Sequence, residues 1–545
     1  MIKREPLKKI PLFTGFLLIF HLLLFYSASG QITGIANERF FSISQNSTST
    51  LEAFGDTLWT GPGLNHWIEH EANWHVPIRA DSVFNGRGRV FSLAVTENHV
   101  LAGLGYTSAT ATGNNVQAAM GYYLKTKTGE SWQFLPFPLD PDPDPELCDS
   151  EETHYQPDCD KLFIYGGREY RRLRIMVPEQ SPPFDVAIED YTMFSVNWAS
   201  GLLRSTNSGE SWHRLILPPS GEPLLHPDQT YEWTSMSPNG EPLNRYDPRA
   251  DNNLLAFGLL IDRERNVWTG TANGINISDN ALDAPADSIV WRHIPFKGEP
   301  DGLLGGWVVT IREQPETGVV WLTNWRSDPE GRDTFGLVST SDTGNTFRHH
   351  LKSVRVNDLT FHQDHIFVAA DEGLYLSSNN GDSWDKINPI ISPNTFIKDG
   401  ARYLAAAATR NRVWIGTTDG IASTTDNGQN WSITRVDVPL RGGNIYQQDA
   451  PDVKTYAYPN PYSQGRHEIT RIRFEVQQQN RVRIRIFDYS MSLIRNLDNR
   501  ELQKGIYETI WDGRDEHGRL VHNGPVFYII EIGRKKFHGK ILVLD

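Results

Sequence analysis

A glycine followed eleven positions later by an aromatic residue recurs along this chain and limits the folds open to it. Six frames with this spacing lie at 63–74, 121–132, 201–212, 336–347, 373–384 and 420–431. A seventh begins at Gly274 and reaches its aromatic residue, Trp291, after 17 positions. An apolar run precedes every frame, and a further β-type run usually precedes that one. Each unit therefore predicts four antiparallel strands, and seven units predict a seven-bladed β-propeller over residues 31–445.

Short polar segments inside the frames predict tight turns between the third and fourth strands. Ser, Thr, Asp and Asn side chains hold such turns by bonding to local backbone, and glycine supplies left-handed geometry. The aromatic residue that opens the last strand is expected to cover the hairpin. The expected turn residues are Thr340, Asp342, Gly344, Phe347, Gly381, Trp384, Thr424, Asp426, Gly428 and Trp431.

These turns resemble the Asp-box (BNR) motif of sialidase-like and sortilin-like β-propellers, which reads Ser-x-Asp-x-Gly-x-x-Trp. The segment from Thr424 to Trp431 matches it best, and the resemblance covers about residues 40–440. In these folds the Asp-box is structural and lies away from the ligand face. Because such propellers serve sialidases, xyloglucan hydrolases, sorting receptors and assembly factors, the resemblance implies a fold and leaves the function open.

The N-terminus has the parts of a secretory signal. A basic segment, an apolar run over 16–26 and a small-residue segment over 27–30 follow one another. The apolar run is shorter than the ~20 residues that a membrane span needs. We expect cleavage after Gly30 and a secreted or bacterial cell-surface protein with no transmembrane segment in the mature chain; an uncleaved anchor is the alternative.

An acidic, Pro-rich stretch contains both cysteines of the chain, Cys148 and Cys159. In an oxidising compartment we expect them to form a disulfide that closes a surface loop, with two free thiols as the alternative. The same stretch holds Asp140 and the weak calcium candidates Asp142, Asp144 and Asp149. Carboxylates are suitable Ca²⁺ ligands, but the interspersed prolines favour an extended, solvated loop.

The C-terminal part predicts a second domain. A linker containing Pro, Gly and Gln over 446–466 leads into short alternating strands over 467–545, which suggest an Ig-like sandwich. It resembles the Ig-like domain of flagellar hook-capping proteins and the sorting domains of type IX secretion cargo. The matching residues are Tyr458, Pro459, Asn460, Pro461, Trp511, Asp512, Gly513, Asp515, Gly518 and Tyr528. Pro525 and Asp545 depart from that pattern. The resemblance implies a sorting or anchoring role and a secretion machine as partner.

Charge separates the two parts of the chain. The whole chain carries −14, which excludes a nucleic-acid binder driven by phosphate neutralisation. Residues 455–545 contain 15 Lys/Arg and 11 Asp/Glu, a net charge of +4, and residues 1–30 carry +3, so residues 31–454 carry −21. An acidic propeller with a mildly basic tail implies two surfaces with different partners, although acidity can also serve solubility alone.

Catalytic motifs are weak in this sequence. His66, Glu69 and His70 match the inverted zinc-protease pattern, but in a strand Glu69 would point away from both histidines. The Arg-Ile-Pro segment of sialidases is missing. A glycoside hydrolase of the xyloglucanase kind needs two carboxylates ~5–10 Å apart across a cleft, and the sequence does not select a pair.

Six tryptophans lie on or near the predicted inner strands: Trp198, Trp268, Trp307, Trp321, Trp325 and Trp414. We expect most to pack between blades and one or two to line the axial cleft, where they could stack on a sugar or a peptide. The sequence thus favours a non-enzymatic binding module for a protein or glycan ligand, with no catalytic residues and no cofactor. An extracellular polysaccharide hydrolase on the same propeller is the alternative.

Overall fold

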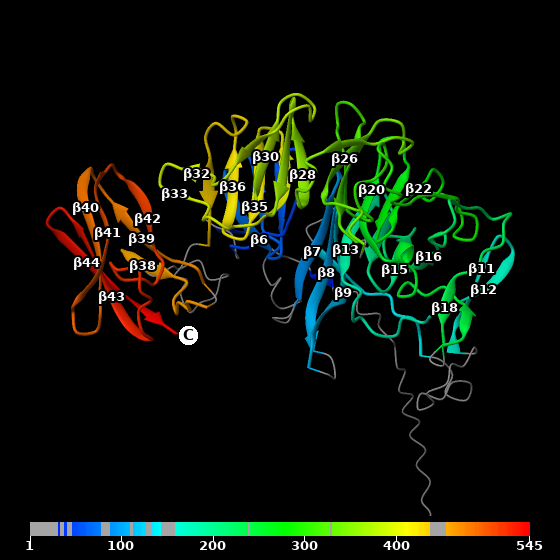
Figure 1. Cartoon of the computed structure of the whole chain (residues 1–545), viewed down its shortest axis with the longest axis horizontal. Coiled ribbons are helices and arrows are strands. Elements are labelled where there is room, and N and C mark those ends of the chain that lie inside the picture. Colours follow the sequence, from blue (N-terminus) through cyan, green and yellow to red (C-terminus); the bar gives the residue numbers. More distant parts are fainter. Residues whose placement is uncertain are drawn as a thin grey trace, which may run out of the picture.

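The computed structural model describes residues 31–32, 37–40, 46–77, 88–109, 113–126, 132–142, 159–237, 240–327, 330–436, 454–465 and 467–544. These residues form strands and turns, with one short 3-10 helix, η2 (Asn252–Leu254) (Figure 1). The all-β fold predicted from the sequence is confirmed. Within these ranges no helix is both long and apolar enough to cross a membrane. The predicted signal, residues 1–30, lies outside them.

Seven antiparallel sheets of four or five strands follow one another along the described part of the chain. From the inner edge outward their strands are β3 (Thr50–Phe54), β4 (Thr57–Gly61), β5 (His66–Ile68), β6 (Asn73–Pro77) and β2 (Asn37–Phe40); β7 (Gly88–Val95), β8 (His99–Ala109), β9 (Asn115–Thr126), β10 (Trp132–Pro136) and β1 (Gln31–Ile32); β13 (Pro183–Glu189), β14 (Thr192–Asn197), β15 (Gly201–Ser205) and β16 (His213–Leu215); β20 (Ala256–Ile261), β21 (Val267–Thr271), β22 (Gly274–Ser278), β23 (Trp291–Ile294) and β17 (Leu224–Leu225); β24 (Trp307–Glu313), β25 (Val320–Trp325), β26 (Gly336–Thr340) and β27 (Arg348–His350); β28 (Val356–His362), β29 (His365–Ala370), β30 (Gly373–Ser377) and β31 (Asp385–Ile387); and β34 (Tyr403–Thr409), β35 (Arg412–Thr417), β36 (Gly420–Thr424) and β37 (Ser432–Thr434).

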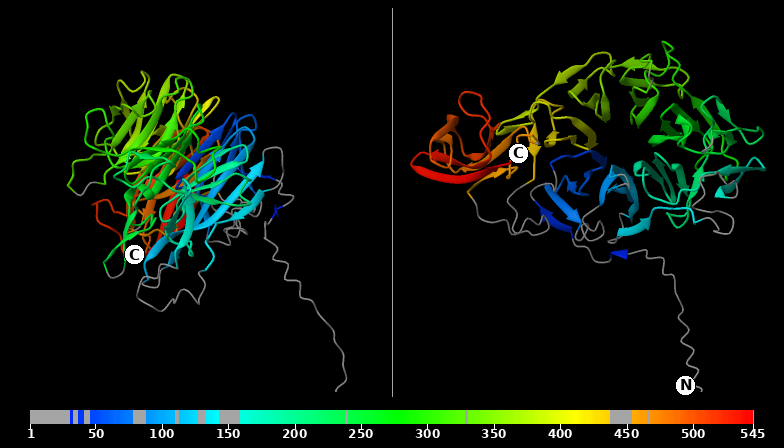
Figure 2. Two further views of the ribbon diagram at one scale, coloured as in Figure 1. Left: turned by 90° about the vertical axis from the view of Figure 1, so that its right-hand side faces the viewer. Right: turned by 60° about the horizontal axis from the view of Figure 1, so that its bottom comes forward.

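The first strands of the seven sheets form a closed ring. Each of β3, β7, β13, β20, β24, β28 and β34 contacts the first strand of the next sheet, and β34 returns to β3. Figure 2 shows the sheets arranged around a common axis. This is the arrangement of a β-propeller, in which radial repetition leaves only short sheet edges unpaired.

The repeated frame corresponds to the third strand and the turn that follows it. Five third strands, β15, β22, β26, β30 and β36, begin at the frame glycine. In the turn after β26, Thr340 Oγ1 donates to Asp342 Oδ1 at 2.8 Å and accepts from the N–H of Gly344 at 2.9 Å. The same pattern recurs from Thr424 to Gly428. Gly344 has a φ of 80° and Gly428 a φ of 90°, so these turns require the left-handed geometry that glycine supplies.

The aromatic residues of the frames differ in burial. Phe347 and Trp431 are buried, whereas Trp384 is only partly buried and packs beside Trp321 and His350. The frame aromatic therefore seals the hairpin more completely in some sheets than in others.

Three tryptophans join the first sheet to the last. Trp67, Trp74 and Trp414 form a triangle of edge-to-face contacts with ring centroids 5.4–5.5 Å apart. Beside them the carboxylate of Glu69 accepts from Thr409 Oγ1 at 3.0 Å and from Arg412 Nε at 3.4 Å. Apolar burial and charged hydrogen bonds together close the ring at this junction.

Three two-stranded hairpins lie outside the seven sheets: β11 (Lys161–Tyr165) with β12 (Arg168–Arg172), β18 (Thr234–Met236) with β19 (Pro242–Asn244), and β32 (Ile391–Ser392) with β33 (Thr395–Phe396). The first occupies the long interval between the second and third sheets. Cys148 lies outside the described residues, so its disulfide with Cys159 stays a prediction.

The tail domain contains two further sheets on one apolar core. Strands β38 (Thr455–Tyr458), β39 (Thr470–Val476) and β42 (Gly505–Trp511) form one sheet. Strands β40 (Asn480–Phe487), β41 (Leu493–Leu502), β43 (Gly524–Ile532) and β44 (Lys535–Val543) form the other. Ile484, Trp511 and Ile530 are among the buried residues between them. Strand β38 falls within the range predicted as a linker, because its backbone pairs with β39.

A buried charge network joins the tail domain to the last sheet of the propeller. Arg435 donates to Asp419 Oδ2 at 3.0 Å and to Glu508 Oε2 at 2.9 Å, and Arg471 of the tail donates to Asp419 as well. The side chains of Arg435 and Arg471 are 5% and 3% exposed. Two carboxylates and two guanidinium groups thus balance one another across the boundary.

Removing one member of this network is expected to destabilise the contact strongly. Arg471→Ala removes one of the two buried guanidinium groups that pair with the Asp419 carboxylate. Breaking a buried ion pair by removing one partner lowers the free energy of unfolding by roughly 3–5 kcal/mol. Lys398→Ala, which removes the more exposed Lys398–Glu468 pair of the same boundary, should cost less than about 1 kcal/mol. Urea unfolding of the full chain measures both. Equal losses of unfolding free energy in the two variants would contradict a stabilising role of the network.

Candidate binding site in the axial channel

The first strands carry β-bulges where they face the axis of the ring. Six of them, β7, β13, β20, β24, β28 and β34, shift register near their starts. A bulge leaves an extra residue unpaired and re-aims its side chain. The extra residues are Phe91, Phe184, Phe257, Val309, Thr310, Asn357 and Leu404, and all of them line a cavity of about 270 Å³ on the axis. We call this cavity the axial channel.

Two aspartates of the channel tie neighbouring sheets together. Asp185 on β13 accepts from the N–H of Val186 and, with its other oxygen, from the N–H of Leu259 on β20 at 3.0 Å. Asp358 on β28 likewise accepts from its neighbour Leu359 and from Ala406 on β34 at 3.1 Å. Both carboxylates therefore use both oxygens on backbone donors.

An arginine side chain of the fifth sheet lies among these carboxylates. Arg312 on β24 places Nη2 3.3 Å from Asp358 Oδ1 and 3.6 Å from Glu52 Oε2. Because Glu52 belongs to β3 and Arg312 to the fifth sheet, this guanidinium connects sheets that are not neighbours in the ring. The Glu52 side chain is 29% exposed, so the group remains in contact with solvent in the channel.

Burial shifts the pKa values of the ionisable side chains that line the channel. It raises the pKa of Glu52 to about 7, although the charge of Arg312 works in the opposite direction. Burial also raises the pKa of Asp185 to about 7 and raises the pKa of Asp358. Burial lowers the pKa of Arg312, but the negative charges of Asp358, Glu52 and Asp185 have the larger combined effect. The pKa of Arg312 is therefore raised. Burial in the channel therefore favours the protonated form of these carboxyl groups, and the charge of Arg312 opposes it.

Aromatic side chains cluster at one end of the channel: Phe184, Phe257 and Trp325 line it, and Trp198 and Trp307 pack against Phe257. Phe257 lies 5.8 Å from Phe184 and 5.1 Å from Trp307, and Trp198 lies 5.6 Å from Trp307, measured between ring centroids. Trp325 lines the channel beside them. We call these five residues the aromatic mouth. Phe184 is 37% exposed, so part of this surface is open to solvent.

The aromatic mouth lies at the end of the ring opposite to the turns between the third and fourth strands. Phe184 and Trp307 stand at the starts of first strands, and Trp325 ends a second strand. In an antiparallel sheet the turn between the third and fourth strands lies at the other end. The guanidinium of Arg355 stacks 4.1 Å from the Trp325 ring, and Trp325 Nε1 donates to the carbonyl of Val356.

The tryptophans singled out in the sequence fall into two groups. Trp268, Trp321 and Trp414 are buried between sheets, whereas Trp198, Trp307 and Trp325 belong to the aromatic mouth. The channel carboxylates and Arg312 were not selected from the sequence. Their only local signal is an acid or base within an apolar strand, which many surface strands share.

The zinc-protease pattern is not a metal site. His66 is buried and stacks between Trp59, at 4.3 Å, and His75, at 4.9 Å. His70 is 74% exposed in the following turn, and Glu69 points to the last sheet. Because β5 ends at Ile68, the segment is not the helix that zinc ligation by this motif requires.

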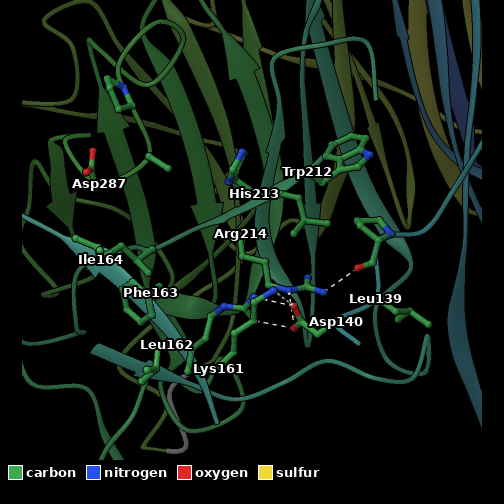
Figure 3. Close-up of a pocket in the computed structure, with 16 residues that line it drawn as sticks. Leu139, Asp140, Lys161, Leu162, Phe163, Ile164, Trp212, His213, Arg214 and Asp287 are labelled. Atoms are coloured by element: carbon green, nitrogen blue, oxygen red, sulfur yellow. Dashed lines mark hydrogen bonds and ion pairs between the residues drawn. The ribbon is translucent and has the colours of Figure 1, made fainter. Parts of the chain in front are cut away.

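Asp140 lies in a basic cluster and not among acids (Figure 3). Its oxygens accept from Arg172 twice at 2.7 Å and from Arg214 at 3.3 Å, and Lys161 approaches to 3.3 Å. Burial alone would raise the pKa of Asp140, but these donors lower it well below the usual range. A carboxylate held by three cations is a poor calcium ligand, so this arrangement is structural.

The other calcium candidates are not brought together in the described part of the chain. Asp142 is exposed, and Asp144 and Asp149 lie outside the described residues. Among the residues that are described, no group of three His, Cys, Asp or Glu side chains could hold a metal ion.

Comparisons with known proteins find structural likeness without sequence relatives. No protein-family model matches the chain, and no curated protein matches it. PorZ, a surface component of the type IX secretion system of Porphyromonas gingivalis, is similar over 92% of this chain and 76% of its own, with 12% identity and a TM-score of 0.34. YCF48 from Cyanidioschyzon merolae is similar over 71% and 98%, with 13% identity and a TM-score of 0.40. An ancestral GH74 enzyme is similar over 92% and 60%, with 12% identity and a TM-score of 0.41.

The raised pKa of Glu52 predicts a pH-dependent effect of its replacement. Folding favours the protonated form of this carboxyl, so ionised Glu52 costs stability, and that cost grows as pH rises from the unfolded pKa near 4.5 towards 7. Glu52→Gln removes the ionisation. The free energy of unfolding of the Glu52→Gln variant, compared with that of wild type at the same pH, should therefore be about 1–2 kcal/mol more favourable at pH 8 than at pH 4. Urea unfolding at the two pH values checks this, and a pH-independent difference would contradict it.

Proposed function

We propose that this chain is an exported β-propeller that binds a protein or glycan ligand at the aromatic mouth without chemical conversion, and that its tail domain delivers it to the cell surface. The observation that carries the proposal is the contrast within the axial channel. Asp185 and Asp358 are engaged by backbone N–H groups of the fold, whereas the aromatic mouth includes Phe184, which is open to solvent.

A hydrolase would need a carboxylate pair that is free to act on a substrate. Asp185 and Asp358 each use both oxygens on backbone N–H groups of two sheets. Glu52 Oε2 lies 3.6 Å from Arg312, so it can act with a second free carboxylate of the channel only if Asp185 or Asp358 gives up its backbone donors. These engagements support binding over glycoside hydrolysis, which needs one acid and one base or nucleophile.

The aromatic mouth offers what a sugar ring or an extended peptide requires. Flat apolar faces contribute stacking area, and nearby polar groups fix orientation. Asn357 and Arg402 line the same channel, and both bond to Asp371. This combination of aromatic area and oriented polar groups is suited to reversible recognition.

Replacing the mouth aromatics should abolish ligand binding while leaving the fold intact. We expect Trp325→Ala with Phe184→Ala to lose at least about tenfold in affinity for any hit from a glycan and peptide array, because such anchors dominate binding. Tyr191→Ala is the matched control: it is 69% exposed and lies in the turn between β13 and β14, at the other end of the sheet. Hits that survive the double replacement would show that the mouth is not the site.

Turnover in the same assay decides between the two classes of function. Release of reducing sugar that is lost in Glu52→Gln would favour the hydrolase and overturn the binding proposal. Binding without release supports it.

The role of the tail domain rests on its resemblance to sorting domains and on its separate core. Its buried residues include Tyr462, Trp511 and Tyr528, which belong to one cluster. A domain with its own core can be recognised by a secretion machine without disturbing the propeller. The boundary network of Asp419, Arg435 and Arg471 means that deletion of the tail also exposes charges of the propeller.

Loss of the tail should stop delivery, and loss of its contact with the propeller should not. In a host with type IX secretion, a chain truncated before Lys454 should remain in the periplasm, as measured by protease accessibility on whole cells. Arg471→Ala weakens the boundary but keeps the tail, so this variant should still reach the surface. Surface exposure of the truncated chain would contradict the delivery role.

A further inference from the structure

The tail sheet formed by β40, β41, β43 and β44 has one buried face and one open face. Along β40, Val482, Ile484 and Ile486 are buried in the core of the domain. The alternate residues Arg481, Arg483 and Arg485 point to the other side, because successive side chains of a strand leave opposite faces. The open face of this sheet is therefore dominated by arginine along its central strand.

Cross-strand pairing concentrates positive charge on that face. Arg483 lies opposite Glu531, which lies opposite Lys536 on β44. The carboxylate of Glu531 is 3.6 Å from Arg483, 3.1 Å from Arg485 and 3.2 Å from Lys536. One carboxylate is thus shared by three cations. Lys540, opposite Phe527, adds a further cation.

We call this surface the cationic face, and its charges do not balance. Its five cations are Arg481, Arg483, Arg485, Lys536 and Lys540, and its two carboxylates are Glu531 and Glu501, the latter opposite Arg481. The side chains of Arg483 and Lys536 are 47% and 70% exposed. An excess of exposed guanidinium and ammonium groups attracts an anionic partner.

An apolar patch adjoins the charges at one end of the same face. Its residues are Leu493, Pro525, Phe527 and Leu542, of which Leu493 is 49% exposed and Leu542 is 37% exposed. Pro525 and Leu542 face one another across β43 and β44. Protein interfaces combine an apolar centre with charged surroundings in this way.

The cationic face points away from the propeller. The residues that join the propeller, Arg471 and Glu508, belong to the other tail sheet, on β39 and β42. Figure 1 shows β38, β39 and β42 nearer to the propeller than β40, β41, β43 and β44. Docking of the tail onto the propeller thus leaves the cationic face available.

We propose that the cationic face docks a partner protein whose surface is acidic around an apolar patch. Planar guanidinium groups pair with carboxylates through two parallel hydrogen bonds, which suits Arg481 and Arg483 to aspartate and glutamate side chains. The apolar patch supplies the desolvated contact that a purely electrostatic surface lacks. This inference rests on the delivery role proposed above and names the chemistry by which the tail is recognised.

A labelled random copolymer of glutamate and tyrosine is a suitable probe, because it combines carboxylates with apolar rings. The full chain should bind it, and Arg483→Glu with Lys536→Glu should weaken binding by at least about tenfold. Arg500→Glu with Lys504→Glu is the matched control: it makes the same charge change in the same domain, at Arg500 opposite the core residue Val482 and at Lys504 between β41 and β42, and should weaken binding less than about threefold. Thermal unfolding of each variant verifies that it folds.

Three outcomes overturn the inference, and a fourth separates it from the delivery role. Equal loss in the two double variants would mean a nonspecific charge effect. Binding to vesicles with anionic lipids but not to the copolymer would identify a membrane as the partner. Self-association that is lost in Arg483→Glu with Lys536→Glu would identify a second copy of the chain. Copolymer binding with failed surface delivery would refute the delivery role and leave this face as a docking site.

Discussion

The junction between the first and last sheets holds the ring together, and the rest of the molecule depends on it. Trp67, Trp74 and Trp414 pack there, and Glu69 crosses from one sheet to the other. If this junction opened, the first strands could no longer face a common axis, and the channel would be lost. Because it joins segments more than 300 residues apart, its formation carries the entropy cost of closing a long loop, which the packing of the sheets between must offset.

In two other places, buried carboxylates join parts of the structure by accepting hydrogen bonds from neighbouring sheets or domains. In the channel, Asp185 and Asp358 each accept N–H groups from two sheets. At the tail boundary, Asp419 accepts from Arg435 and Arg471. A buried carboxylate is costly without such partners, so these residues make the arrangement of the sheets and domains specific. The same hydrogen bonds of Asp185 and Asp358 are the basis of the binding function proposed above.

The two ends of the molecule have different surfaces. The aromatic mouth is built by bulges that turn residues such as Phe184 and Phe257 towards the axis. The cationic face is built by regular alternation along β40, where Arg481 and Arg483 leave the sheet on the side opposite to the core. The tail boundary couples these surfaces in one chain while keeping them apart. A ligand at one and a partner at the other would therefore not compete for space.

Local sequence determined the all-β fold, the position of the turns between the third and fourth strands of the sheets, and the strands of the tail domain. These features depend on short-range chemistry: the hydroxyl of Thr340, the carboxylate of Asp342 and the backbone freedom of Gly344 act within a single turn. Tertiary structure alone decided which acids share the channel, because Glu52, Asp185 and Asp358 meet only after ring closure. It also decided that Trp325 lines the channel whereas Trp321, four residues earlier, is buried between sheets. The physical reason is that register shifts and closure depend on contacts between distant sheets, which no local pattern specifies.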